Sequence, residues 1–213
     1  MQKRVVVTGI GMVTPLGLDT ATTWKAIKEG ISGIDHISGF DAEGFETRIA
    51  GEVQDFDPEA YMPRKEARHT DRFVQLAMAA AVEAIANSGL VIDQHNAAEI
   101  GVIVGSGIGG IGTLSSQFRV LEDRGPSRVS PFLIPMMIAD MASGHLSIRL
   151  GAKGPNFCTV SACSSGADAI GESAEMIKRG EVKAMVAGGA EASVVPIGVA
   201  GFASAGALSK RNS

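Results

Sequence analysis

Residues 156–187 have the sequence NFCTVSACSSGADAIGESAEMIKRGEVKAMVA, and this stretch decides the fold class of the chain. Residues 156–162 predict a strand, and residues 163–179 predict a helix that ends at Gly180. A second strand is predicted over residues 182–187. A strand, a helix and another strand in succession are typical of an α/β fold with a mostly parallel sheet.

The same alternation extends to the rest of the chain. Residues 100–104 are a continuous apolar run, which is typical of a strand covered on both faces. Residues 4–8, RVVVT, predict another strand before Gly9, and a short strand is expected near residues 48–53. Further helices are predicted over residues 21–29, 71–87, 113–122 and 136–150. The predicted fold class is therefore α/β, with a mostly parallel sheet between helices.

Composition and charge exclude several classes of protein. Hydrophobic residues make up 45% of the 213 residues and charged residues 20%, so a packed core is expected and wholesale disorder is not. With 19 basic and 23 acidic residues the net charge is −4, which argues against a nucleic-acid-binding surface. The two cysteines exclude a disulfide scaffold, and free thiols fit a reducing compartment, so we expect a cytoplasmic protein.

Membrane, metal and nucleotide sites are not expected. The longest uncharged run, residues 192–209, includes Pro196 and several glycines, which favours a buried core segment over a membrane span. No set of histidine, cysteine and carboxylate residues has metal-ligand spacing, so no metal is predicted. Residues 9–14 lack the third glycine of a dinucleotide-binding loop. Residues 105–110 lack the Lys-Ser/Thr of a phosphate loop and better suit a wall that a chain-like ligand approaches closely.

The best candidate for catalysis is Cys163, in the segment VSACSSG at residues 160–166. The predicted strand ends here and the helix begins, so unpaired N–H groups and the helix dipole favour a thiolate at Cys163. The same N–H groups can bind a developing oxyanion. The alternative is a buried cysteine without a chemical role. Cys158 lies inside the predicted strand, where burial is expected to raise its thiol pKa and leave it inert.

The residues alone show no base for this nucleophile. None of the four histidines stands in an evident catalytic motif; they are His36, His69, His95 and His145. A basic stripe is predicted as well, because four-residue spacing places side chains on one face of a helix. Its members are Arg64, Arg68 and Arg72, with Lys65 and His69 beside them. Both a solvated face and a docking surface for an acidic partner fit this stripe.

Several segments together resemble the β-ketoacyl-[acyl-carrier-protein] synthases of the elongating, type II kind. SACSSG at residues 161–166 and AGGAE at residues 187–191 are highly specific in combination. The resemblance covers essentially all 213 residues. It includes RVVVTGIG (4–11), TPLG (14–17), GHL (144–146), GPN (154–156) and the segment from Gly201-Phe202 to Ala207-Leu208-Ser209.

The resemblance implies a thiolase-like fold, in which two similar α/β halves pack as layers of helix and sheet, usually in a homodimer. It implies that Cys163 takes an acyl group from acyl carrier protein, with its own backbone N–H as one oxyanion donor. Malonyl carrier protein then loses CO₂ and attacks this thioester, giving a 3-oxoacyl carrier protein in fatty acid biosynthesis. No cofactor and no metal are implied.

The same resemblance assigns residues to the partner and to the substrate. The acidic carrier protein would dock on Arg64, Lys65, Arg68 and His69, with Arg124 and Arg128 extending that surface. The acyl pocket would include Ile108 and Phe132, and Phe202 lies in a segment that resembles a pocket-proximal turn. Neither a nucleic acid nor a membrane is expected as a partner.

The chain differs from the family pattern in its extent. Family members have a second half with two catalytic histidines, a lysine and the second oxyanion donor, whereas this chain ends at Ser213. We expect residues 1–213 to be an N-terminal half-domain, with insertions at about 31–70 and 106–135, that cannot complete the condensation alone. Rival interpretations are a polyketide ketosynthase, a thiolase acting on coenzyme A thioesters, and a non-catalytic partner subunit. Non-catalytic partner subunits resemble synthases but lack the nucleophilic cysteine, whereas this chain has Cys163.

Overall fold

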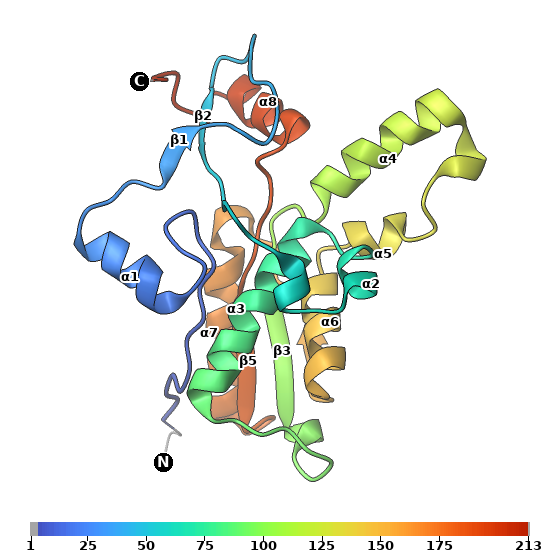
Figure 1. Ribbon diagram of the computed structural model, residues 1–213. Coiled ribbons are helices and arrows are strands. Elements are labelled where there is room, and N and C mark those ends of the chain that lie inside the picture. The colour runs from blue at the N-terminus through green and yellow to red at the C-terminus, as the bar shows by residue number, and fades with distance from the viewer. Residues whose placement is uncertain (1–3, 213) are drawn as a thin grey trace.

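A three-stranded parallel sheet forms the centre of the chain in the computed structural model, which describes residues 4–212 (Figure 1). The strand order is β4 (Asn156–Phe157), β3 (Ile100–Gly105), β5 (Ala184–Gly189). Every residue of β3 is buried, as its continuous apolar sequence predicts. The predicted α/β class with a parallel sheet is therefore confirmed.

Helices cover both faces of this sheet (Figure 1). On one face lie α3 (Arg72–Ser88) and α6 (Met141–Leu150), and on the other lies α7 (Ser165–Arg179). An antiparallel pair, β1 (Ile34–His36) and β2 (Ile49–Gly51), stands apart from this sheet. The remaining helices are α1 (Thr20–Lys28), α2 (Arg64–Ala67), α4 (Ile111–Arg124), α5 (Leu133–Met137) and α8 (Pro196–Ser204). Short 3-10 helices are η1 (Pro58–Ala60), η2 (Ala97–Glu99), η3 (Pro126–Arg128) and η4 (Ala162–Ser164).

Alternate residues of β3 build the two halves of the core, since successive side chains of a strand point to opposite faces. Val102 packs with Phe73 of α3 and Leu146 of α6. Ile103 faces the other way and packs with Ala169 of α7. The central strand thereby joins the helices of both faces to one sheet.

Glycines let α7 approach the sheet unusually closely at its first turn. A Cβ atom on Gly105 would lie 2.2 Å from the carbonyl oxygen of Ser165. A Cβ atom on Gly189 would lie 2.8 Å from the Cα atom of Gly166. Backbone therefore packs on backbone where the helix begins.

The predicted strand over residues 4–8 is wrong. β-branched residues favour extended backbone, but a strand needs a hydrogen-bonded neighbour, and within residues 4–212 none pairs with this segment. The residues that follow it, 9–12, are held against α3. Cβ atoms on Gly9 and Gly11 would lie 2.1 and 1.8 Å from carbonyl oxygens of α3. The Met12 N–H donates to Glu83 at 3.0 Å.

The strand predicted over residues 156–162 is much shorter, because a side chain enters the ladder. Ser143 Oγ accepts the Val104 N–H at 2.9 Å and donates to the Phe157 carbonyl oxygen at 3.0 Å. These two backbone groups would otherwise be available to pair across the strands. The paired residues of β4 therefore end at Phe157. One further backbone hydrogen bond, from the Ser106 N–H to the Thr159 carbonyl at 3.3 Å, holds the segment that leads to Cys163.

The helix predicted over residues 136–150 is two helices, α5 and α6. The Met137 carbonyl accepts the Gly110 N–H at 3.0 Å instead of continuing the helical ladder. Ile138 is extended, with φ −64° and ψ 127°, and the chain restarts as a helix at Met141. The other predicted helices are confirmed, each within two residues at its ends.

The uncharged segment 192–209 contains α8, which lies beside β1 and β2 (Figure 1). Gly198 and Val199 are buried, but Ile197 is 54% exposed and Phe202 41%. The expectation of a buried core segment is therefore wrong for most of its length, because α8 is covered on one side only. Across residues 4–212, the helices are too short or too polar for a membrane span.

Candidate active site

A tight turn presents Cys163 at the start of α7. Cys163 lies in η4, which runs directly into α7, and its side chain is exposed. Ser165, only 3% exposed, closes the turn. Its hydroxyl accepts the Ser161 N–H at 2.9 Å and donates to the Ala162 carbonyl at 2.7 Å. The expected position of Cys163, at or near the first helical turn, is confirmed.

The residue before Cys163 has an unusual backbone. Ala162 adopts φ 54°, a region that costs a non-glycine residue about 1–3 kcal/mol. The Ser165 hydrogen bonds hold this conformation. Asp168, in the first turn of α7, accepts a hydrogen bond from the Ser161 hydroxyl. The turn around the thiol is therefore fixed by short-range polar contacts.

The glycine-rich loop after β3 lies directly against this turn. A Cβ atom on Gly107 would lie 3.3 Å from the Ala162 carbonyl oxygen. On its other side the loop is bound by Glu191, whose Oε2 accepts the N–H groups of Gly107 at 2.8 Å and Ile108 at 3.2 Å. No individual role is predicted for Glu191 from the sequence. The available clue was an acidic residue just after a parallel strand, at the edge where such sheets bind ligands.

Cys158 occupies a different environment from Cys163. Burial raises the pKa of the Cys158 thiol, and the charges of Asp140 and Glu191 act in the same direction. A backbone hydrogen bond with Ser106 acts in the opposite direction. Both cysteines are free thiols, as predicted. The expected direction of the Cys158 pKa shift is confirmed, although this residue lies just beyond β4 and not within a strand.

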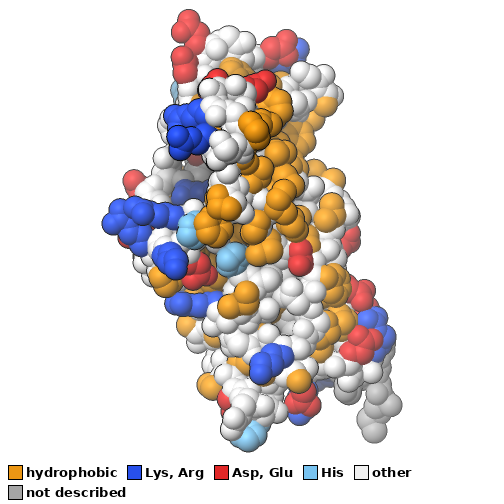
Figure 2. Space-filling view, turned by 90° about the vertical axis from the view of Figure 1, so that its right-hand side faces the viewer, with side chains coloured by type: hydrophobic (Ala, Val, Ile, Leu, Met, Phe, Trp, Pro, Cys, Tyr) orange, Lys and Arg blue, Asp and Glu red, His pale blue; other side chains and the backbone are white. Residues whose placement is uncertain are grey.

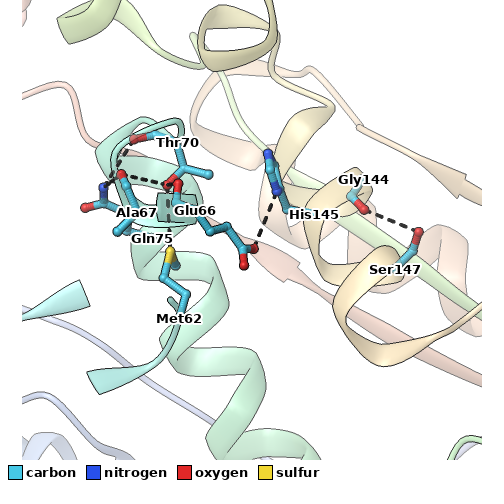
Figure 3. A network of polar contacts seen from close by, with 8 residues as sticks. All are labelled: Met62, Glu66, Ala67, Thr70, Gln75, Gly144, His145 and Ser147. Atoms are coloured by element: carbon cyan, nitrogen blue, oxygen red, sulfur yellow. Dashed lines mark hydrogen bonds and ion pairs between the residues drawn. The ribbon is translucent and has the colours of Figure 1, made fainter. Parts of the chain in front are cut away.

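A polar network anchors α2, which carries the first basic residues of the predicted stripe (Figure 3). Thr70 Oγ1 donates to the carbonyls of Glu66 and Ala67 at 3.2 Å. Gln75 Nε2 donates to the Ala67 carbonyl at 2.9 Å. Glu66 Oε1 lies 3.7 Å from His145 Nδ1, an ion pair when the imidazole is protonated. These contacts end α2 and tie it to α3 and α6.

The prediction that one helix presents Arg64, Arg68 and Arg72 on a single face is wrong. α2 ends at Ala67, and Arg72 begins α3. The Arg72 guanidinium donates to the Val53 carbonyl at 3.2 Å and stands 4.6 Å over the Phe56 ring. Burial lowers the pKa of Arg72. Arg72 is therefore a structural residue, whereas Arg64, Lys65 and Arg68 are exposed on or beside α2.

The three predicted pocket residues lie in different surroundings. Ile108 is 40% exposed in the loop beside Ala162. Phe132 stacks on His69 with ring centroids 3.7 Å apart. Phe132 and His69 line a cavity of about 510 Å³ together with Lys65, Glu66 and His145, and Ile108 is not part of its lining. Phe202 lines a separate cavity of about 500 Å³ between α8 and the β1–β2 pair. The structure thus brings one docking residue and one pocket residue into contact.

The other predicted docking residues lie at the far end of α4, which projects from the body of the molecule (Figure 1). Arg124 ends α4, and Arg128 ends η3 just beyond it; both are exposed. Apolar side chains gather on the same side of the molecule (Figure 2). They include Leu114, Phe118 and Leu121 of α4, which are 43%, 57% and 41% exposed.

The histidines lie apart from the candidate nucleophile. His69 and His145 line the cavity beside Glu66, His36 is in β1, and His95 follows α3. In the part of the chain that the structure describes, none of them is hydrogen-bonded to Cys163. Within residues 4–212, no three histidine, cysteine or carboxylate side chains are arranged to hold a metal ion.

The sequence of the chain matches a known protein family. The model of the family described as "Beta-ketoacyl synthase, N-terminal domain" matches residues 2–213. The chain belongs to the β-ketoacyl synthase family. It is 52% identical over 211 residues to the 3-oxoacyl-[acyl-carrier-protein] synthase 2 of Synechocystis sp. (strain ATCC 27184 / PCC 6803 / Kazusa), covering 99% of this chain and 51% of that protein. Identity to the Vibrio harveyi protein of the same name is 49%, with the same coverage. The chain thus spans about half the length of these synthases.

Solved β-ketoacyl synthase structures have the same fold. A synthase from Burkholderia phymatum STM815 superimposes with a TM-score of 0.86 at 32% identity, covering all of this chain and 52% of the other. The ishigamide ketosynthase/chain length factor gives a TM-score of 0.89 at 28% identity, covering 98% and 52%. The predicted thiolase-like fold is confirmed.

Proposed function

We propose that the protein containing this chain is a β-ketoacyl-[acyl-carrier-protein] synthase that elongates acyl chains in fatty acid biosynthesis. The observation that supports this most directly is an exposed Cys163 in a fixed turn at the start of α7. Its context is a chain that is 52% identical to a 3-oxoacyl-[acyl-carrier-protein] synthase 2. Its two free thiols fit a cytoplasmic protein.

In the proposed reaction Cys163 acts as a covalent catalyst. Its thiolate attacks the carbonyl carbon of an acyl thioester, the new S–C bond forms, and the carrier thiol leaves with a proton. The malonyl group of a second carrier then loses CO₂, and its carbanion attacks the same carbonyl. A C–C bond forms, the Cys163 S–C bond breaks, and 3-oxoacyl carrier protein is released. The Cys163 N–H stabilises the oxyanion in both steps.

Residues 1–213 are proposed to form the first α/β half of this enzyme, with cap-like insertions at about 31–70 and 106–135. The histidines described above do not contact Cys163, which supports a base supplied by another segment. We therefore expect that residues 1–213 alone do not complete the condensation. Formation of 3-oxoacyl product by a purified chain of 213 residues would contradict this part of the proposal.

The proposed partner is acyl carrier protein, in acyl- and malonyl-loaded forms. Arg64, Lys65 and Arg68 are exposed around α2, where an acidic partner can reach them, although Arg64 also pairs with Glu59 at 3.4 Å. His69, Arg124 and Arg128 are assigned to the same partner from the family resemblance. The apolar side chains of α4 support a second association, a homodimer of the complete protein (Figure 2).

A mass measurement on the complete protein tests the proposal. After incubation with a long-chain acyl carrier protein, we expect the acyl mass on the Cys163 peptide and none on the Cys158 peptide. Cys163→Ala should abolish the adduct, and the matched variant Cys158→Ala should retain it. An unmodified Cys163 in the folded wild-type protein would refute the synthase proposal and favour a non-catalytic partner subunit.

A polyketide ketosynthase is the second candidate. The superposition on the ishigamide ketosynthase/chain length factor, with a TM-score of 0.89, favours it specifically. Product analysis separates the two candidates. Repeated malonyl addition without reduction of the keto groups would indicate a polyketide enzyme, and a single two-carbon extension would indicate the fatty acid enzyme.

A further inference from the structure

The loop between β3 and α4 binds the carboxylate of an exposed residue, Glu191. Glu191 Oε2 accepts the consecutive N–H groups of Gly107 at 2.8 Å and Ile108 at 3.2 Å. The Ser106 hydroxyl donates to Glu191 Oε1 at 3.4 Å. Ser106 Oγ in turn accepts the Gly109 N–H at 3.0 Å. Successive backbone N–H groups that converge on one oxygen form an anion-binding nest. The ligand of this nest is a side chain of the protein itself.

The other side of the same loop contacts the turn that carries the nucleophile. Gly107 lies against Ala162, with its Cβ position 3.3 Å from the Ala162 carbonyl oxygen and 3.5 Å from Cα. A shift of the loop in one direction would collide with Ala162, and a shift in the other would lengthen the Glu191 hydrogen bonds. Ile108 follows Gly107 and is the one large side chain among residues 105–110, and it is 40% exposed.

The contact between Gly107 and Glu191 is long-range, with a sequence separation of 84. β5 ends at Gly189, and the Ala190 N–H donates to the Gly105 carbonyl at 3.0 Å, which extends the β3–β5 pairing up to Glu191. The backbone of Glu191 therefore follows directly on the paired strands, and its exposed carboxylate reaches back to the loop. Bonds from N–H groups to a carboxylate are among the stronger hydrogen bonds in proteins.

We propose that Glu191 is a positioning residue that fixes the loop of Gly107 and Ile108 against the turn that carries Cys163, and thereby sets which acyl chains Cys163 accepts. This inference rests on the proposed synthase function. An acyl chain bound to Cys163 must pass the residues that border its turn, and Ile108 is held there through its own backbone N–H. Loss of the carboxylate lets this residue move relative to the thiol, and a displacement of about 1 Å changes reaction rates strongly.

Two measurements on the complete protein test the proposal in Glu191→Ala and Glu191→Gln. Hydrogen exchange of the Gly107 and Ile108 amides should accelerate about tenfold or more in Glu191→Ala, because both lose a charged acceptor. Glu191→Gln retains one acceptor oxygen and should exchange more slowly than Glu191→Ala. The ratio of Cys163 acylation rates for short and long acyl carriers should change about fivefold or more in Glu191→Ala and return toward wild type in Glu191→Gln.

Glu99→Ala is the matched control. Glu99 pairs with Lys183 at 2.7 Å, at the opposite end of the same two strands. We expect it to leave both the exchange and the acylation ratio unchanged. If Glu191→Ala does not fold, Glu191→Asp, which withdraws the charge by one methylene, should give a smaller shift of the same kind.

Two results would overturn the inference: unchanged exchange at Gly107 and Ile108 in Glu191→Ala, or a uniform loss of acylation with an unchanged chain-length ratio. Failure of the wild-type protein to acylate Cys163 is a different result. It would refute the proposed function, and the exchange data would still decide whether Glu191 holds the loop.

Discussion

Gly105→Ala tests whether the close approach of α7 to the sheet determines the position of Cys163. The added Cβ atom would lie 2.2 Å from the Ser165 carbonyl oxygen, and ordinary contacts start at 3.4 Å. Backbone on both sides must therefore separate by about 1 Å. Because Gly105 has no left-handed φ, the effect comes from this contact and not from backbone strain. The shift falls on Ser165, whose hydroxyl closes the turn around Cys163.

Overpacking of a well-packed interior costs about 1–3 kcal/mol, and a clash with backbone on both sides belongs at the upper end. We expect Gly105→Ala to lower the free energy of unfolding by about 3 kcal/mol, measured by urea denaturation. Acylation of Cys163 should fall about tenfold or more under conditions in which the variant is folded. Gly171→Ala is the matched control on α7, since no atom lies within 4 Å of its Cβ position. It should stabilise the protein by about 0.5–1 kcal/mol.

Wild-type stability and acylation in Gly105→Ala would refute the reasoning, because the glycine would then be replaceable at no cost. An equal loss of stability in both variants would refute it too, since the effect would come from helix or sheet propensity and not from the contact.

Three further predictions concern single side chains. Asp71→Asn should lower the free energy of unfolding by about 2 kcal/mol in urea, because the buried carboxylate accepts both the N–H and the hydroxyl of the third residue of α4. Iodoacetamide at pH 8 should modify Cys163 well before Cys158, since burial raises the pKa of Cys158 and keeps that thiol protonated; equal labelling in the mapped peptides would contradict this. Arg72→Lys should lower the free energy of unfolding by about 1–2 kcal/mol, because lysine cannot reproduce the two hydrogen bonds to carbonyls and the contact with the Phe56 ring. Arg64→Lys, at an exposed position, should change the free energy of unfolding by less than about 0.5 kcal/mol.

The elements that could be predicted from the sequence are those with local determinants. α3 was predicted within one residue at each end, since Asp71 caps its first turn and Gly89, with φ 66°, ends it. β3 was predicted because a fully buried strand is apolar throughout. The start of a helix close to Cys163 was predicted as well, although the strand before it ends at Phe157 and not at the cysteine.

The errors come from contacts between residues distant in the chain. Nothing near Phe157 indicates that Ser143 enters the ladder and ends β4. Residues 4–8 have the composition of a strand, but composition does not provide a pairing partner. The prediction that Arg72 shares a helix face with Arg64 and Arg68 was wrong because Thr70 and Gln75 end α2 through side-chain hydrogen bonds. Residue spacing alone does not reveal these bonds. Glu191 was overlooked as a site residue for the same reason.

The projecting helix α4 acts mechanically as a lever. With 14 residues it is about 20 Å long, and the buried Asp71 carboxylate holds its first turn by accepting the N–H and the hydroxyl of Thr113. A tilt of about 10° at the base would move the tip, with Arg124, by about 3.5 Å. A small change at Asp71 is therefore amplified into a large displacement of surface charge, while the basic residues of α2 stay in place.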